Sequence, residues 1–317
     1  TSTEAGNIPE NVFFMFQMTF AIITPALVVG AFVERIKFSA VLWISGLWLL
    51  FVYAPVTHWI WGGGWLAAMG LQDFAGGLVV HLNCGMAALV IAKILGPRKG
   101  FPNDVKPPHN PALVFVGAAL LWVGWFGFNG GSALAADGAA GMAITVTHIS
   151  AATAALTWMF IEWMSHGKPT LVGIATGTIA GLATITPASG FVGPVGALII
   201  GVLAGIICYK MCGIIKNNWN IDDALDVMAV HGIGGVLGIL LTAPLGSPIF
   251  GGLGLSDQTI GSQFITQVIG VIAVGLWCLI ITWLITLIVK KTIGLRVDDD
   301  QEIEGLDTSI HGEKGYN

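Results

Sequence analysis

Charged residues are scarce in this chain. Of its 317 residues, 13 are Lys or Arg and 18 are Asp or Glu, which is 10% of the total. Soluble domains carry about 25% charged residues. This shortage, together with a mean hydropathy of +0.82, excludes a water-soluble globular protein. The net charge of -5 excludes the basic surface that nucleic acids require, so we expect no nucleic-acid partner.

Cysteine is also rare, with four residues, and its placement excludes a disulfide framework. Each Cys lies within or at the end of an apolar run, where a thiol behaves as a small buried hydrophobic group. Cys208 and Cys212 are one helical turn apart, but no His or second Cys pair lies near them in the sequence. The pattern therefore predicts no structural zinc site.

Long uncharged apolar runs are abundant. Because a helix rises 1.5 Å per residue, about 20 apolar residues cross ~30 Å of hydrocarbon. The 44 Gly favour closely packed helices, since small residues let backbones approach. The sequence predicts an all-α polytopic membrane protein with nine transmembrane helices. These are expected at 12–33, 40–60, 75–95, 111–130, 141–164, 170–187, 192–214, 225–245 and 263–290.

The distribution of charge supports this count, because Lys and Arg accumulate in cytoplasmic loops. Nine spans place all thirteen basic residues on one side and leave only acids in the opposite loops. We therefore expect a multi-pass protein of the cell membrane with an outer N-terminus and a cytoplasmic C-terminus. The basic residues are Arg35, Lys37, Lys93, Arg98, Lys99, Lys106, Lys168, Lys210, Lys216, Lys290, Lys291, Arg296 and Lys314. The outer acids are Glu4, Glu10, Asp73, Asp137 and Asp257.

Two spans carry a similar local pattern 150 residues apart. His81 begins HLNCGMAAL and His231 begins HGIGGVLGIL, with an acid upstream of each, at Asp73 and Asp226. Weak internal symmetry of this kind is typical of transporters built from structural repeats. In the predicted topology the two His helices run in opposite directions, as an inverted repeat requires.

Three His lie inside spans, where an ionisable side chain is costly and is therefore a candidate functional group. The matched pair, His81 and His231, is expected to meet near the membrane midplane, as a polar lining for a neutral solute or as a proton relay. His148 has no counterpart, and a hydrogen bond to a neighbouring helix explains it equally well. A metal would need further ligands, and Cys84 is the one evident donor at a plausible depth, so we expect no metal site.

Aromatic residues gather at the outer ends of the second and fourth spans. Such rings usually form an interfacial belt. Rings that converge beside a hydroxyl and acidic loops can also cage a small cation. The candidate rings are Phe16, Phe20, Trp59, Trp61, Trp65, Trp122, Trp125, Phe126 and Phe128, and the hydroxyl is that of Ser132.

Several motifs, in order, resemble the ammonium transporter family (Amt, Mep and Rh proteins), and in particular its Amt branch. The resemblance extends from Ile8 to the end of the chain. The motifs are FQMTF at 16–20, HWIWGGG at 58–64, DFAGG at 73–77, VH at 80–81, GWFGFN at 124–129, VHG at 230–232, GLRV at 294–297, EGLD at 304–307 and HGE at 311–313.

The resemblance implies roles for residues at the outer end. Phe20, Trp61 and Ser132 are similar to the family's outer ammonium site, and Asp73 to the acid that recruits ammonium and holds the vestibule. Phe20 and Phe128 resemble the stacked pair that closes the pore below that site.

Deeper in the pore, His81 and His231 resemble the family's twin histidines, and Leu27 and Leu121 match apolar lining positions. An ammonium ion is costly in a dry pore, whereas neutral ammonia is not. Deprotonation before entry is therefore expected, with net charge transport favoured by the resemblance to the Amt branch. A passive ammonia or gas channel in the Rh manner, and an ammonium sensor with little transport, are the alternatives.

Family members are typically homotrimers with eleven spans in an inverted repeat. The resemblance implies two further spans before Thr1, so we expect nine of eleven helices here. Residues 1–295 are expected to form the transmembrane domain and 296–317 a cytoplasmic tail that receives PII signal proteins. We expect no cofactor. No Ser-Lys, paired Asp or His-Glu-x-x-His arrangement occurs within the spans, so a transporter is predicted rather than an enzyme.

Overall fold

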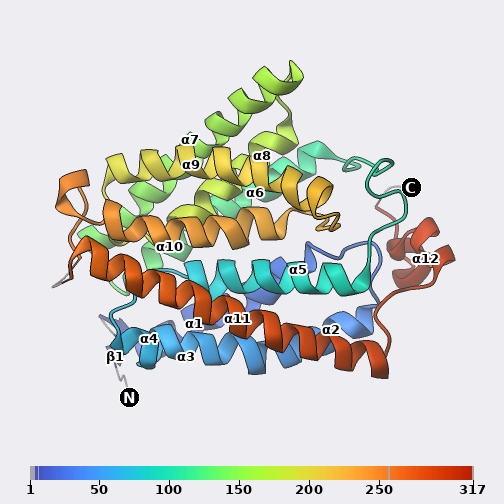
Figure 1. Ribbon diagram of the computed structural model, residues 1–317, viewed down its shortest axis with the longest axis horizontal. Coiled ribbons are helices and arrows are strands. Elements are labelled where there is room, and N and C mark those ends of the chain that lie inside the picture. The colour runs from blue at the N-terminus through green and yellow to red at the C-terminus, as the bar shows by residue number, and fades with distance from the viewer. Residues whose placement is uncertain (1–3, 6, 256–257, 316–317) are drawn as a thin grey trace.

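The computed structural model describes residues 4–5, 7–255 and 258–315, and in this part of the chain apolar helices lie side by side along the long axis (Figure 1). Eight helical segments are long and apolar enough to cross a membrane, and α8 (Leu171–Ile185) is a shorter apolar helix of 15 residues. All nine predicted spans are therefore present as helices. The predicted acid Asp257 lies outside the described residues.

Most spans begin or end within a few residues of the prediction, and several contain a π-helical turn (η). In chain order they are α1 (Glu10–Val29), α2 (Phe38–Trp48) with η1 (Leu49–Tyr53) and α3 (Ala54–Trp61), η2 (Gly77–Leu82) with α5 (Asn83–Leu95), α6 (Pro111–Trp125) with η3 (Phe126–Gly130), α7 (Gly138–His166), α8, α9 (Pro194–Gly213) with η4 (Ile214–Asn218), η5 (Met228–Ile233) with α10 (Gly234–Leu245), and α11 (Ile260–Thr292). The short elements are β1 (Glu4–Ala5), β2 (Ile8–Pro9), α4 (Trp65–Ala68), η6 (Pro248–Phe250), α12 (Asp299–Glu304) and η7 (Asp307–His311).

Helix α8 is the most enclosed of the three helices α7, α8 and α9, and glycine permits this packing. A Cβ atom at Gly181 of α8 or at Gly201 of α9 would lie 2.5 or 2.7 Å from the backbone oxygen of Ser150 in α7. The Ser150 hydroxyl donates a hydrogen bond to the Gly181 oxygen at 2.9 Å. Small residues thus allow the backbones to touch, as expected for helices that no hydrophobic force draws together in lipid.

The two His segments cross in opposite directions. Helix α5 packs against η5, and α10 packs against η2, which is the arrangement that antiparallel neighbours produce. At the crossing, a Cβ atom on Gly85 would collide with the backbone of Gly232, and one on Gly235 would lie 2.5 Å from the Gly77 oxygen. This contact confirms the inverted orientation that the repeated sequence pattern predicts.

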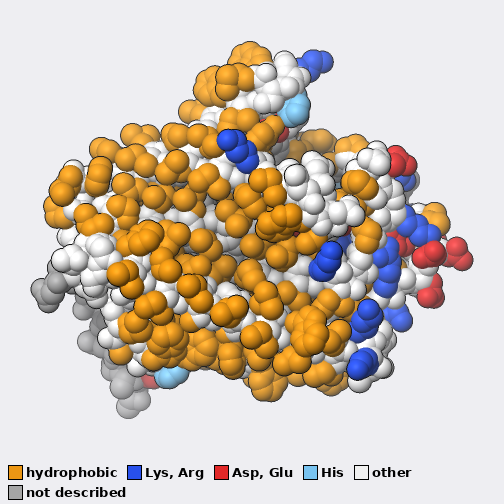
Figure 2. Space-filling view, viewed as in Figure 1, with side chains coloured by type: hydrophobic (Ala, Val, Ile, Leu, Met, Phe, Trp, Pro, Cys, Tyr) orange, Lys and Arg blue, Asp and Glu red, His pale blue; other side chains and the backbone are white. Residues whose placement is uncertain are grey.

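Basic residues gather at one end of the molecule. Figure 2 shows most of the visible Lys and Arg side chains near α12, at the end opposite β1. Here Asp222 accepts hydrogen bonds from the Arg98 backbone N–H, Nε and Nη2 at 2.8–2.9 Å. Arg35, fully buried, donates to the Asp222 carbonyl oxygen at 2.6 Å. Burial lowers the pKa of Arg35 to about 10. Its Nη1 atom lies 3.8 Å from Oδ2 of Asp222, so the two side chains form an ion pair.

The C-terminal segment continues from this end of the bundle. The Val297 N–H donates to the Arg35 oxygen at 3.1 Å, and Arg296 pairs with Glu302 of α12 at 2.7 Å. The tail therefore rests on the turn between α1 and α2.

We predict that Asp222→Asn destabilises the protein strongly, because the buried guanidinium of Arg35 and the partly buried guanidinium of Arg98 lose their anion. Breaking one side of a buried ion pair typically costs about 3–5 kcal/mol, measurable by chemical unfolding in detergent micelles. Burial tends to raise the pKa of Asp222, but Arg98 and Arg35 outweigh it and hold this pKa below its usual value. The stabilisation is therefore present above the usual pKa of about 3.9 and is lost as the pH falls through the lower folded value.

The matched control is Asp299→Asn, which breaks the exposed pair between Asp299 and Lys99. Exposed pairs contribute about 0–1 kcal/mol, so this variant is expected to unfold almost as the original protein does. Equal losses for the two variants would contradict the assigned role of Asp222.

Candidate functional site

A line of aromatic rings leads from the surface to the interior at the end opposite the basic cluster. The Trp61 and Phe20 rings are 5.5 Å apart and edge to face, and the Phe20 and Phe128 centroids are 4.6 Å apart. Phe128 stacks with His81 at 5.9 Å, and His81 stacks with His231 at 5.2 Å. The five side chains come from α3, α1, η3, η2 and η5, so the fold assembles this line from distant parts of the sequence.

Asp73 holds the Trp61 end of this line in place. Its carbonyl oxygen accepts a hydrogen bond from the Trp61 indole N–H at 2.8 Å, which fixes the orientation of that ring. Its carboxylate accepts from backbone N–H groups at the start of η2, those of Gly76, Gly77, Leu78 and Val79, at 2.6–3.3 Å.

The environment of the Asp73 carboxylate is mixed. Burial raises its pKa, and the four N–H donors work in the opposite direction. Both carboxylate oxygens are engaged by the backbone. The side chain therefore holds the loop between α4 and η2 in place.

Ser132 lies one turn after Phe128, and its hydroxyl donates to the Phe128 oxygen at 2.8 Å. The adjacent Gly131 lies against the Phe16 ring, where a Cβ atom would be 2.8 Å from the ring edge. Phe16 in turn contacts Phe20, with ring centroids 4.9 Å apart. The chain around Ser132 therefore lies beside the rings of Phe16 and Phe20.

An apolar cavity of about 580 Å³, open to the surface beside the exposed side chains of Ile22 and Leu120, lies between α1 and α6 next to Phe20 and Phe128. It contains two of the predicted lining residues, Leu27 and Leu121. Its lining residues are Phe16, Thr19, Phe20, Ile22, Ile23, Leu27, Leu120, Leu121, Gly124, Trp125, Gly127 and Phe128. The predicted gate and the predicted apolar lining therefore share one space.

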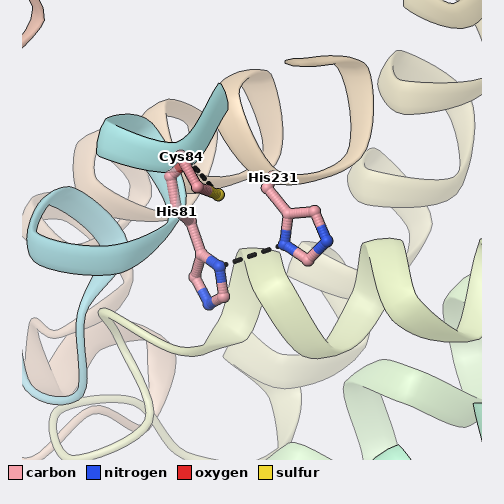
Figure 3. Close-up of side chains that lie close together, drawn as sticks. All are labelled: His81, Cys84 and His231. Atoms are coloured by element: carbon pink, nitrogen blue, oxygen red, sulfur yellow. Dashed lines mark hydrogen bonds between the residues drawn. The ribbon is translucent and has the colours of Figure 1, made fainter. Parts of the chain in front are cut away.

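The predicted His pair is present in the structure. His81 Nδ1 and His231 Nδ1 are 3.1 Å apart, so one ring donates its N–H to the lone pair of the other (Figure 3). Both rings are buried, and His81 Nε2 has no protein partner among the described residues. The described protein groups therefore leave the hydrogen-bonding capacity of that nitrogen unused.

His148 does not join this pair. Its exposed ring contacts Trp122 at 5.1 Å and Phe126 at 6.1 Å. Trp59 and Trp65 pair with each other at 6.0 Å, and Trp59 also packs on Trp277 of α11. The rings of Trp59 and Trp65 thus form a separate aromatic group.

The sequence motifs did not identify one residue that the structure places in an equivalent position to Asp73, namely Asp223. Its carboxylate accepts the Met228 N–H at 2.7 Å, five positions ahead, just as Asp73 accepts the Leu78 N–H at 2.8 Å. Both aspartates precede their His by eight residues, so the 150-residue offset that relates the two His also relates these acids. Applying that offset to Asp73 would have identified Asp223.

Asp226, which the sequence pattern favoured as the matching acid, is therefore the wrong residue. It corresponds to Gly76, and both take a left-handed backbone conformation, with φ of 59° and 119°. The Asp226 carboxylate instead accepts from Lys216 at 2.7 Å. Burial, with the nearby negative charge of Asp226, raises the pKa of Asp223 to about 6. Each half of the repeat thus begins with an aspartate that caps its His segment.

Comparison with known proteins agrees with the fold and with the sequence motifs. A sequence model of the Ammonium Transporter Family matches residues 1–316. An ammonium transporter of Aquifex aeolicus is 49% identical over 309 residues, which is 98% of this chain and 72% of that protein. The ammonium transporter Amt1 of Archaeoglobus fulgidus is 46% identical and covers 96% of this chain and 78% of its own length.

Solved structures give the same result. A sensor Amt protein superimposes with a TM-score of 0.88 at 33% identity, covering 95% of this chain and 76% of the other. The crystal structure of Mep2 from Saccharomyces cerevisiae gives a TM-score of 0.82 at 35% identity, covering 92% of this chain and 68% of the other. The chain is a polytopic membrane protein and belongs to the ammonium transporter family.

Proposed function

We propose that the protein captures ammonium at its outer end, removes a proton, and passes ammonia along the line of rings to the His pair. The observation that carries this proposal is the unbroken sequence of ring contacts from Trp61 through Phe20 and Phe128 to His81 and His231, each no longer than 5.9 Å.

The outer step is binding of a small cation by Phe20, Trp61 and Ser132. Aromatic faces attract a cation with about 0.5–2 kcal/mol, more where water is excluded. The Ser132 oxygen can accept an N–H bond from ammonium. Potassium offers no N–H, so it gains nothing from that acceptor, which favours ammonium over an ion of similar size.

The inner step requires a neutral solute. The cavity beside Phe20 and Phe128 is lined by apolar groups such as Leu27 and Leu121, which cannot replace the hydration of an ion. Ammonia carries no such cost, and His81 Nε2 supplies a polar contact at the end of the ring line. The proton lost by ammonium moves separately through the His pair, which gives net charge transport.

The proposal also covers the orientation of the protein in the membrane and its assembly. We place the basic end and the tail from Arg296 on the cytoplasmic side of the cell membrane, because basic residues accumulate there. Homotrimer formation, and docking of a PII signal protein at this face, are part of the proposal. The fit to a sensor Amt protein favours ammonium sensing as the second candidate function.

An ammonium concentration jump on proteoliposomes is expected to produce a transient current, whereas a potassium jump is not. The reason is that ammonium can release a proton and enter the apolar path as ammonia, whereas potassium has no proton to release. The measurement is a solid-supported membrane recording, with protein-free vesicles as the control. Internal pH change without current would indicate a neutral channel, and ammonium binding without either signal would indicate a sensor.

Asp73→Asn is expected to lower ammonium uptake at least tenfold, because one amide oxygen replaces an acceptor that serves four N–H donors and holds the loop behind Trp61. The assay is uptake into proteoliposomes, with a monodisperse detergent peak showing that the variant is folded. The matched control is Asp137→Asn, since Asp137 caps α7 at the same end without contacting the rings. Full uptake by the Asp73 variant would remove this residue from the mechanism.

Replacing His81 and His231 together by Leu is expected to reduce the ratio of ammonium current to potassium current at least tenfold. The variant lacks the imidazole nitrogens that carry the separated proton. Replacing His148 by Leu serves as the control, because that ring lies outside the pair, and it should leave the ratio unchanged. A double variant with an unaltered current and intact potassium rejection would leave the relay unsupported.

A further inference from the structure

Three metal-binding donor atoms meet where the two His segments cross. One ring nitrogen of His81, one of His231 and Cys84 Sγ all lie within 4.8 Å of one another, and all three residues are buried. Figure 3 shows the Cys84 thiol directed toward the His231 ring. The sequence argued against a metal because two imidazoles need further ligands, and the fold brings Cys84 to them. The proposed ammonia pathway gives no role to Cys84.

The spacing of these atoms suits a shared ion. Zinc–imidazole bonds are about 2.1 Å and zinc–thiolate bonds about 2.3 Å, and monovalent copper forms bonds of similar length. Two donors on one ion are then about 3.3 to 4.4 Å apart, depending on the angle. The two Nδ1 atoms, at 3.1 Å, are close to the lower value. The thiol donates to the His81 carbonyl oxygen of its own helix at 3.3 Å, a hydrogen bond that a bound ion would replace.

Charge selects the kind of ion. A net charge is costly at this depth in a membrane protein. A monovalent cation bound to one thiolate and two neutral imidazoles forms a site with no net charge, whereas a divalent cation would leave one positive charge. Thiolate and imidazole together prefer soft metals such as copper(I). The donor set therefore fits monovalent copper or silver better than zinc.

We propose that Cys84, His81 and His231 form a binding site for a soft monovalent cation, copper(I) or silver(I), which blocks the pore when it binds. The ion displaces the thiol proton of Cys84, so one proton is released for each ion bound. The imidazole that donates its Nδ1–H in the free pair shifts that proton to Nε2, and both Nδ1 lone pairs then face the ion. No oxidation or reduction takes place. The blocking effect rests on the proposed ammonia pathway, and the binding does not.

Silver(I) is the probe, because it needs no reductant. We would titrate silver nitrate into the purified protein in chloride-free detergent buffer, count bound ions by equilibrium dialysis, and record proton release at constant pH. One tight site with one proton released is expected. X-ray absorption at the silver edge is expected to show two nitrogen neighbours and one sulfur neighbour.

Cys84→Ser tests the site, because serine keeps the size of the side chain but offers no soft donor. We expect its affinity for silver to fall at least tenfold, and its ammonium current to persist at silver concentrations that abolish the current of the original protein. Cys278→Ser is the matched control, since Cys278 is also buried and also donates to a backbone oxygen, that of Asn83. Cys208→Ser and Cys212→Ser remove the other neighbouring thiols and should also leave tight binding unchanged.

Unchanged tight binding in Cys84→Ser would overturn the proposal, as would a silver spectrum with sulfur neighbours alone or loss of the tight site in Cys208→Ser. Binding and current are measured separately, so the two proposals can fail independently. Tight binding by a protein without ammonium current would contradict the proposed transport, and an ammonium current that silver leaves unaffected would contradict the block.

Discussion

Polar groups inside a membrane-spanning bundle must find their partners within the protein, because hydrocarbon offers none. Threonines in the spans meet this constraint locally: the hydroxyls of Thr24, Thr147 and Thr242 each donate to the carbonyl oxygen four residues earlier in the same helix. The exceptions are informative. Among the described residues, nine buried side-chain nitrogen or oxygen atoms have no protein partner, and His81 Nε2 is one of them. The unsatisfied atoms thus include a member of the region proposed to handle a polar solute.

The two aspartates explain how the His segments are held. A helix that starts inside a bundle leaves its first N–H groups without acceptors. Asp73 satisfies four of them with one carboxylate, and Asp223 does the same for Met228 at the opposite end of the repeat. Because each acid lies eight residues before its His, the repeat places both imidazoles at the same distance along their segments. The half that begins with Asp73 also holds the Trp61 ring, whose N–H donates to the Asp73 carbonyl oxygen, so the two halves differ in their side chains while sharing one backbone design.

Much of this structure could be predicted from the sequence. Apolar run length gave all nine helices, because hydrocarbon thickness fixes how many residues a span needs. The contact between His81 and His231 followed from the matched segments, whereas the cage residues, taken from the resemblance to a known family, stay a prediction. The residue of the second repeat that corresponds to Asp73 was assigned wrongly, because the sequence shows an acid at both Asp223 and Asp226. Only the backbone conformation distinguishes a capping residue from a residue in a left-handed turn. The proximity of Cys84 to His231 could not be predicted either, because it depends on the angle at which two helices cross.

The contact of Gly85 with Gly232 has a mechanical consequence. With no side chain between them, the two backbones already touch, so the helices cannot come closer, and moving them apart would break the His81–His231 hydrogen bond. In the proposed pathway, a rigid crossing leaves the passage of a solute to rotations of single side chains such as Phe20 and Phe128. Collective helix motions take microseconds to milliseconds, and side-chain rotations are much faster. Under the proposed function, the protein would therefore admit one small molecule after another without rearranging its bundle between them.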